Sequence, residues 1–290
     1  MKLRLAYNTD QNQLINIWKI CFNDMDEAIK LFFCNRFKTK DCVVCELNSK
    51  IVASLYMFDA SIKDNNGVLS AFYIYAAGTL PNYRGKGYMK ALISYANSIQ
   101  LLRNKKCSFL LPANDRLYGY YNKLGYKKFF KSCFLSLSNS KMKRYVNSGM
   151  YVEQELDFNN LYDLRTKICS KNLGSIIWDK KAIDYAFKLN DIYGGKNIIL
   201  KDGYAICILN GNNLEIVEFF ANENSFNNLM KSIYNQFPKC NLYKFKFSKT
   251  LTKFFKNSII KDFGMIKFLD EELNHNMNNA SYPYLGLTLD

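Results

Sequence analysis

The chain has 290 residues, of which 49% are hydrophobic and 22% charged, and this balance predicts a soluble globular protein with two domains. No stretch approaches the roughly 18 consecutive apolar residues of a membrane span, and the polar N-terminal segment lacks the apolar core of a secretory signal. The net charge of +15 is dispersed along the chain, so we expect neither a membrane nor a nucleic-acid partner.

The cysteines and the single histidine limit which metal sites and catalytic mechanisms the chain could contain. The nine cysteines occur singly, apart from Cys42 and Cys45 in a C-x-x-C with the pattern of a buried strand. No second cysteine pair or histidine cluster completes a zinc site, so we expect reduced core cysteines in a cytoplasmic protein without a metal. Because His275 is the only histidine, a Ser-His-Asp or Cys-His mechanism would have to run through that residue.

The first half of the chain predicts alternating strands and helices from its apolar periodicity. The expected strands are 3–7, 42–47, 51–58, 69–80, 107–112 and a pair within 126–137. The expected helices are one that begins after Thr9 or Asp10, one at about 24–37, one that opens within PNYRGKGYMK, and one at 114–124.

The second half partly repeats this order. Residues 138–149 lack apolar periodicity and mark a linker, so we expect domains at 1–140 and 151–290 joined by 141–150. The expected helices are 159–170, 180–189, 225–237 and 251–260, and the expected strands are 197–201, 204–209, 214–220, 242–247 and 263–269. The repeated order indicates an internal structural repeat.

The segment 79–89 carries the strongest chemical signal. It leaves a strand, turns at Gly85 and Gly87 and opens a helix, so unpaired backbone amides at the positive end of a helix surround a small concavity. The glycines let phosphate oxygens approach the backbone, and Arg84 and Lys86 add positive charge. We therefore predict a pyrophosphate site, and the alternative is a plain helix start with a glycine turn.

Spacing excludes two other phosphate loops. A P-loop requires G-x-x-x-x-G-K-[ST], but Gly85 and Gly87 lie too close together and no Ser or Thr follows. A dinucleotide fingerprint requires a third glycine where Lys90 stands.

The order of elements and motifs resembles the GNAT acetyltransferase superfamily. Arg84, Gly87 and Met89 occupy the marked positions of its R/Q-x-x-G-x-G/A motif, with Met89 departing from Gly or Ala. Its second motif, N-x-x-A-x-x-x-Y-x-x-x-G-F/Y, is matched by Asn114, Leu117, Tyr121, Gly125 and Tyr126. The resemblance implies an α/β (α+β) protein of two tandem GNAT-like domains, each a mixed, mostly antiparallel sheet flanked by helices.

The resemblance also implies acetyl-CoA as cosubstrate. Tyr121 then matches the position of the general acid. The alternative is that Tyr121, like Tyr118 and Tyr120 beside it, only packs in the core. The implied cofactor-binding residues are Ala77, Gly78, Thr79, Arg84, Gly85, Lys86, Gly87, Tyr88, Met89 and Asn114. Tyr73 and Tyr75 are candidates for lining the acceptor pocket. The general base stays open between Glu46, Asp59 and water.

The tandem pattern further resembles the Eis-type acetyltransferases, here without their third, sterol-carrier-like domain. Residues 221–229 of the second half contain no Arg or Gly, and Ile260 stands where Tyr121 stands in the first, so we expect no CoA there. The resemblance implies a primary amine, on a small molecule or a protein, as the acceptor, and an oligomer is possible. Two alternatives stay open: a non-catalytic acyl-CoA sensor and a tRNA-dependent aminoacyl transferase of the twin-GNAT type.

Overall fold

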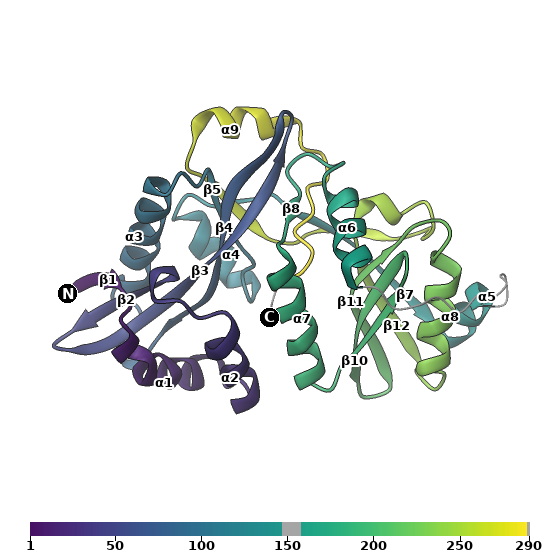
Figure 1. The fold of residues 1–290 in the computed structure, drawn as a ribbon, viewed down its shortest axis with the longest axis horizontal. Helices are drawn as coiled ribbons and strands as arrows, with labels where there is room; N and C mark the ends of the chain where they lie inside the picture. The colour runs from purple at the N-terminus through teal and green to yellow at the C-terminus, as the bar shows by residue number, and fades with distance from the viewer. Residues whose placement is uncertain (147–157, 289–290) are drawn as a thin grey trace. The chain divides into compact units, whose positions relative to one another are not determined.

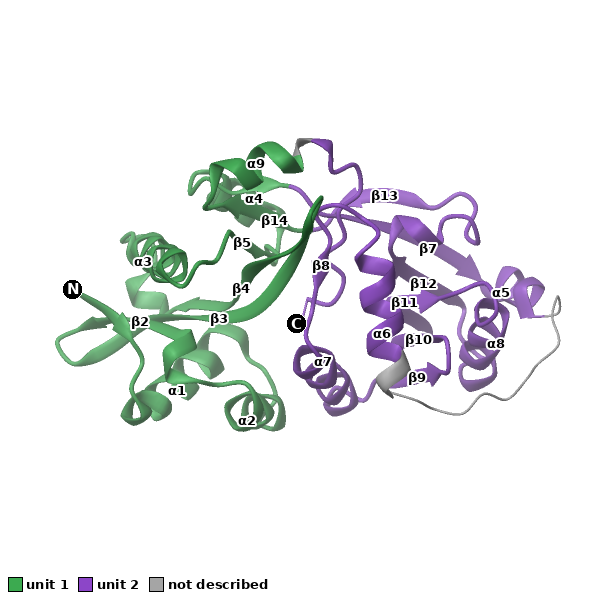
Figure 2. Cartoon of the chain, turned by 45° about the horizontal axis from the view of Figure 1, so that its top comes forward, with its two compact units in different colours: residues 1–128, 264–278 green, residues 129–263, 279–290 purple. Residues whose placement is uncertain are grey.

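The protein, seen here as a computed structural model, is described at residues 1–146 and 158–288 and divides into two compact units (Figures 1 and 2). Unit 1 comprises Met1–Lys128 and Gly264–Asn278, and unit 2 comprises Phe129–Phe263 and Asn279–Asp290. Each unit is therefore built from two separate stretches of chain.

This division differs from the contiguous domains expected at 1–140 and 151–290. The expected linker at 141–150 starts inside helix α5 (Asn139–Val146), and its last four residues lie outside the described residues. The physical reason is strand pairing, because hydrophobic strands pair where a sheet edge is available, whatever their distance along the chain.

Unit 1 is a mixed sheet with helices on both faces. Its strands are β1 (Lys2–Leu5), β2 (Cys42–Leu47), β3 (Lys50–Asp64), β4 (Gly67–Thr79), β5 (Cys107–Leu110), β6 (Lys127–Lys128) and β14 (Met265–Phe268). Its α-helices are α1 (Gln11–Phe22), α2 (Asp26–Asn35), α3 (Tyr88–Leu102), α4 (Asp115–Asn122) and α9 (Glu271–Asn276). The strand order is β1-β2-β3-β4-β5-β14-β6, and among these neighbours only the β4–β5 pair is parallel.

Two neighbouring residues of β3 show which helices cover which face of this sheet. Tyr56 lies 5.5 Å from Trp18 of α1, measured between ring centroids, whereas Met57 accepts a 3.3 Å hydrogen bond from Gln100 of α3. Because successive side chains of a strand point to opposite faces, α1 and α3 cover opposite faces (Figure 1). The α1 and α2 side holds an aromatic cluster in which Phe32 also contacts Trp18 and Tyr56.

Unit 2 repeats this plan with a second mixed sheet, formed by β7 (Lys131–Ser138), β9 (Lys196–Leu200), β10 (Gly203–Asn210), β11 (Asn213–Ala221), β12 (Leu242–Phe247) and β13 (Ile259–Asp262). The short strand β8 (Ile176–Ile177) is not part of this sheet. The α-helices of unit 2 are α5, α6 (Phe158–Cys169), α7 (Lys180–Ile192) and α8 (Phe226–Gln236). The order β13-β7-β12-β11-β10-β9 is antiparallel except for β11–β12. The expected mixed, mostly antiparallel sheets flanked by helices are confirmed.

The ends of the two halves exchange strands. The two strands expected within 126–137 are present as β6 and β7, but they belong to different sheets: β6 pairs with β14 in unit 1, and β7 lies between β12 and β13 in unit 2. The helix expected at 251–260 is wrong. That stretch holds the end of a short 3-10 helix (Lys249–Leu251), turns with Asn257 at a φ of 65°, and the start of β13. Pairing of β13 with β7 overrides the local apolar spacing there.

Unit 2 contains a buried ion pair beside the C-terminal segment. Arg165 of α6 donates to Glu218 of β11 at 3.3 Å, and the two side chains are at most 1% exposed. Tyr204 and Tyr284 donate their hydroxyls to the same carboxylate at 2.5 and 3.3 Å. Burial and the Glu218 carboxylate raise the pKa of Tyr204 well above its ordinary value, so this phenol stays a donor.

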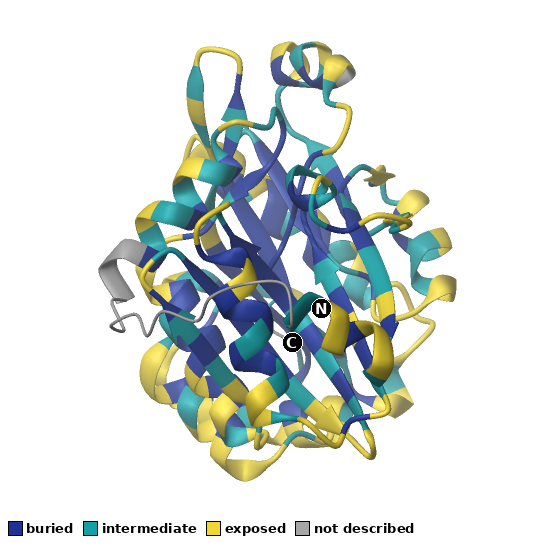
Figure 3. Cartoon of the chain, turned by 90° about the vertical axis from the view of Figure 1, so that its right-hand side faces the viewer, coloured by how far each residue is buried: buried dark blue, intermediate teal, exposed yellow. Residues whose placement is uncertain are grey.

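Burial follows the sheets, as Figure 3 shows by the dark strands and the exposed residues on turns and outer helix faces. Within the described residues, no helix has the length and apolarity that crossing a membrane requires.

Candidate functional site

Strand β4 is interrupted by a β-bulge near its end. Its register against β3 shifts by one residue between Tyr75 and Gly78, and Ala76 there has a φ of 45°. A non-glycine residue with positive φ stores strain, and such residues cluster where backbone must be re-aimed. The bulge therefore changes the direction of the last residues of β4 relative to the rest of the strand.

Beyond this bulge, one edge of β4 has no strand beside it. The parallel partner β5 pairs with β4 only at residues 71–73, and no other described strand follows on that side. Leu80 donates its N–H to the carbonyl of Val52 on β3 at 3.0 Å, so by alternation the backbone groups of Thr79 point away from β3. Of the predicted backbone contacts, Thr79 faces the open edge and Gly78 faces β3. Ala77 lies between the bulge and this pair.

The C-terminal turn of α1 packs against the same stretch of β4. A Cβ placed on Gly78 would lie 3.2 Å from a ring carbon of Phe22 and 3.3 Å from Cys21, so glycine permits the close approach. Cys21 donates its thiol to the Thr79 carbonyl at 3.4 Å. Burial raises the pKa of this thiol, while the nearby Arg84 guanidinium acts in the opposite direction.

Cys21 follows Leu14, Ile17 and Trp18 at helical spacing, which places it on the apolar face of α1. Its position beside the end of β4 depends on how α1 packs against the sheet, and no local pattern signals that contact.

The predicted pyrophosphate loop joins β4 to α3. Gly85 and Gly87 adopt φ values of 76° and 81°, and nothing lies within 4 Å of a Cβ built on either residue. Gly87 is the N-cap of α3 and has no side chain, so no N-cap side chain accepts a hydrogen bond from the backbone amides of the first turn. Arg84 donates Nε to the Thr79 carbonyl at 2.9 Å. The loop thus combines left-handed glycines, a helix N-terminus and an anchored cation.

The other loop residues lie around this N-terminus. Tyr88 and Met89 occupy the first turn of α3 and are partly buried. The Lys86 ammonium lies 5.6 Å from the ring centroid of Tyr83, and the Tyr83 and Tyr88 rings are 6.5 Å apart. Such a set of backbone amides and cations favours a phosphate group over an uncharged ligand.

Helix α4 carries the predicted acid. Asn114 caps this helix, its side-chain oxygen accepting the Leu117 N–H at 3.3 Å, and Tyr121 in the last turn is 8% exposed. The Tyr121 ring lies 5.9 Å from that of Tyr126, whose hydroxyl hydrogen-bonds Ser108. Burial raises the pKa of Tyr126 to about 12, so Tyr126 stays protonated and ties the end of α4 to β5.

The two candidates for the acceptor pocket, Tyr73 and Tyr75, lie in the core. They are 1% and 6% exposed. Tyr75 stacks on Phe58 at 4.8 Å, and Tyr73 lies 5.3 Å from Phe109. Their role toward an acceptor stays a prediction.

Both candidate bases are engaged elsewhere. Glu46 pairs with Arg4 at 2.7 Å, and Asp59, whose side chain is 66% exposed, pairs with Lys105 at 2.5 Å. Neither contact involves the end of β4, so the structure places neither of these two carboxylates beside it.

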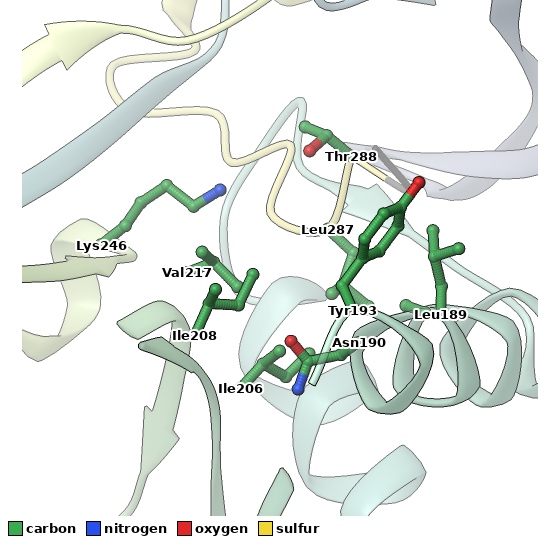
Figure 4. Close-up of a pocket in the computed structure, with 10 residues that line it drawn as sticks. Leu189, Asn190, Tyr193, Ile206, Ile208, Val217, Lys246, Leu287 and Thr288 are labelled. Carbon is green, nitrogen blue, oxygen red and sulfur yellow. The ribbon is translucent and has the colours of Figure 1, made fainter. Parts of the chain in front are cut away.

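The corresponding loop of unit 2, residues 222–225 between β11 and α8, contains neither Arg nor Gly. It carries Glu223, which pairs with Lys253. A separate cavity of about 120 Å³ lies between α7 and the sheet, with Asn190, Ile206, Val217, Lys246 and Leu287 among its lining residues (Figure 4). This volume is below the roughly 300–1,000 Å³ of typical small-molecule sites. In the described parts of both units, no group of three or more His, Cys, Asp or Glu residues could hold a metal ion.

Comparisons with known proteins agree with this architecture. The family model of the acetyltransferase (GNAT) domain matches residues 2–129. A GCN5-related N-acetyltransferase from Anabaena variabilis is 18% identical with a TM-score of 0.75, over 93% of this chain and 73% of that one. One from Kribbella flavida is 15% identical with a TM-score of 0.74, over 94% and 72%. Eis1 from Mycobacterium abscessus is 10% identical with a TM-score of 0.67, over 94% and 75%. No curated protein matches the sequence.

The similarity to these solved structures shows that the chain has the fold of the GCN5-related N-acetyltransferases (GNAT). The family model of the acetyltransferase (GNAT) domain assigns residues 2–129 to that domain family. The similarity of the chain in fold to Eis1 and the other two structures extends over both units.

Proposed function

We propose that this chain moves an acetyl group from acetyl-CoA to a primary amine by direct attack, with Tyr121 as the general acid. The observation that carries the proposal is the loop at 84–87, where two left-handed glycines and an uncapped helix N-terminus adjoin the open edge of β4. The residues fit the group: Arg84, Lys86 and the first amides of α3 would hold the pyrophosphate, because all offer donors or positive charge to it.

The open edge of β4 suits the acyl end of the cosubstrate. The Thr79 backbone, which faces this edge, and the adjoining amide of Ala77 would hold the pantetheine arm and polarise the thioester carbonyl, a contribution of about 3 kcal/mol to the transition state. The amine nitrogen then bonds to the carbonyl carbon and the C–S bond breaks. The thiolate takes its proton from Tyr121, the attacking nitrogen loses a proton to water, and the Tyr121 phenolate regains a proton from solvent.

Two other features support the proposal. All nine cysteines are free, which fits a reducing compartment such as the cytoplasm. The glycine loop disfavours the tRNA-dependent alternative, which has no use for a pyrophosphate site. A sensor without catalysis would need Arg84 but not the Tyr121 hydroxyl, so enzyme assays separate the two.

The direct test is CoA release from acetyl-CoA in the presence of a panel of amines: aminoglycosides, polyamines and lysine or N-terminal peptides. Because the protein's own thiols, such as the exposed Cys34, react with thiol reagents, CoA should be quantified chromatographically. We expect amine-dependent release with at least one class. Tight binding of acetyl-CoA without release for any amine would favour the sensor.

Arg84→Glu should weaken acetyl-CoA binding about tenfold to a hundredfold, because a charge-assisted contact to pyrophosphate becomes a repulsion. The measurement is calorimetric titration of acetyl-CoA. Arg144→Glu, on the exposed side of α5, changes the net charge equally and should leave the affinity within about twofold. Equal affinity of Arg84→Glu and the parent would count against the loop as the pyrophosphate site.

A further inference from the structure

Strand β14 brings a residue from the end of the chain to the helix that carries Tyr121. It lies between β5 and β6 in unit 1 and is antiparallel to both. Lys267 of β14 is the register partner of Ser108, the residue whose hydroxyl meets Tyr126. Because register partners share a face of the sheet, the Lys267 side chain lies on the face that carries α4.

Lys267 reaches the turn that ends α4. Its ammonium donates to the Leu124 carbonyl at 2.9 Å, and its stem passes beside Gly125, where a Cβ would lie 3.4–3.8 Å from the Lys267 side chain. Gly125 has a φ of 88°, which closes the turn. The Lys267 contact therefore bears on the short turn that follows α4.

The same turn is bonded to the backbone of Tyr121. The Leu124 and Tyr126 N–H groups donate to the Tyr121 carbonyl at 2.9 and 3.1 Å. A cation at the carbonyl end of a helix is favourable, since it pairs with the negative end of the helix dipole. A displacement of Leu124 would thus be passed directly to the residue proposed as the acid.

The segment around β14 is itself held to unit 1 by polar contacts. Asp270, the N-cap of α9, pairs with Lys106 at 2.7 Å, and Asn274 accepts from Lys127 at 2.8 Å. These bonds hold β14 in its register beside β5, and this register places Lys267 next to the turn that follows α4.

We propose that Lys267 is a positioning residue for Tyr121: it holds the C-terminal turn of α4 so that the phenol stands at the reacting thioester. This inference rests on the proposed function. It assigns the late segment of the chain a part in catalysis, although the family's own motifs all lie within residues 84–126.

Lys267→Met removes the donor and keeps most of the stem. We expect kcat to fall about tenfold, because small misplacements of a catalytic group are costly, while KM for acetyl-CoA stays within about twofold. Lys267→Arg, which restores a cationic donor, should recover most of kcat. Lys261→Met on β13 in unit 2 is the matched control and should resemble the parent. Unchanged kcat in a folded Lys267→Met would overturn the proposal.

A double-mutant cycle with Tyr121→Phe separates positioning from general destabilisation. If Lys267 acts through the phenol, Lys267→Met should have little further effect on the residual rate of Tyr121→Phe. A full tenfold loss in that background would reject the inference while leaving Tyr121 as the acid. Full activity of Tyr121→Phe alone would instead reject the proposed acid. Should Lys267→Met not fold, Lys267→Gln, which removes the charge and shortens the reach of the side chain, replaces it in the same cycle.

Discussion

Tyr121→Phe should lower kcat about a hundredfold to a thousandfold, because the substitution removes the only atom that can protonate the leaving thiolate at this position. The Tyr121 ring contacts those of Tyr120 and Tyr126 at centroid distances of 5.2 and 5.9 Å. Because phenylalanine keeps the ring, these contacts should persist. Affinity for acetyl-CoA should therefore stay within about twofold. Steady-state kinetics together with calorimetric titration measure both quantities.

The neighbouring residue Tyr120 provides the control. It lies on the same helix, is half-buried, and burial raises the pKa of its phenol. Tyr120→Phe should keep kcat within about threefold, since a phenol without contact to the thioester contributes nothing to proton transfer. Comparable losses in the two variants would mean that phenol removal disturbs the helix, and an unchanged Tyr121→Phe would remove the residue from the mechanism.

Glu218→Ala should destabilise unit 2 by about 3–5 kcal/mol, because it leaves the Arg165 guanidinium buried without its carboxylate. The hydroxyls of Tyr204 and Tyr284 lose their acceptor in the same step. Urea unfolding followed by tryptophan fluorescence measures the change. The chain has two tryptophans, so in a Trp18→Phe background the buried Trp178 reports unit 2.

Glu215→Ala on the same strand is the matched control for this experiment. Glu215 pairs with Lys244 at 3.2 Å on the surface, with side chains 37% and 45% exposed. Exposed pairs contribute at most about 1 kcal/mol, so the control should unfold near the parent. A loss below 1 kcal/mol for Glu218→Ala would contradict the assigned role of the buried network.

Much of the first unit follows from local sequence. The apolar spacing of α1 and α3, the strand patterns at 42–47 and 51–58 and the glycines at 85 and 87 predict elements that the structure contains. These features depend on neighbours within a few residues, such as the left-handed φ that glycine permits or the side-chain period of a helix. The family motif at 84–89 and the capped helix at Asn114 are likewise local.

Other features of the site depend on contacts that local patterns do not encode. The buried positions of Tyr73 and Tyr75 depend on α1 and α2 covering their face of the sheet. The strain at Ala76 is decided by register against β3, and the ion pairs of Glu46 and Asp59 by partners on other elements. A strand of alternating tyrosines predicts a face but not which helices cover it.

The sequence by itself determined the alternation of strands and helices, the loop chemistry at 84–87 and the absence of that chemistry from residues 221–229. Only the tertiary structure decided that β14 joins the first sheet and β7 the second, and that the stretch at 251–260 is not a helix. The reason is that a strand has no intrinsic partner: backbone hydrogen bonds are satisfied by whichever sheet edge is available, and this is a property of the whole fold.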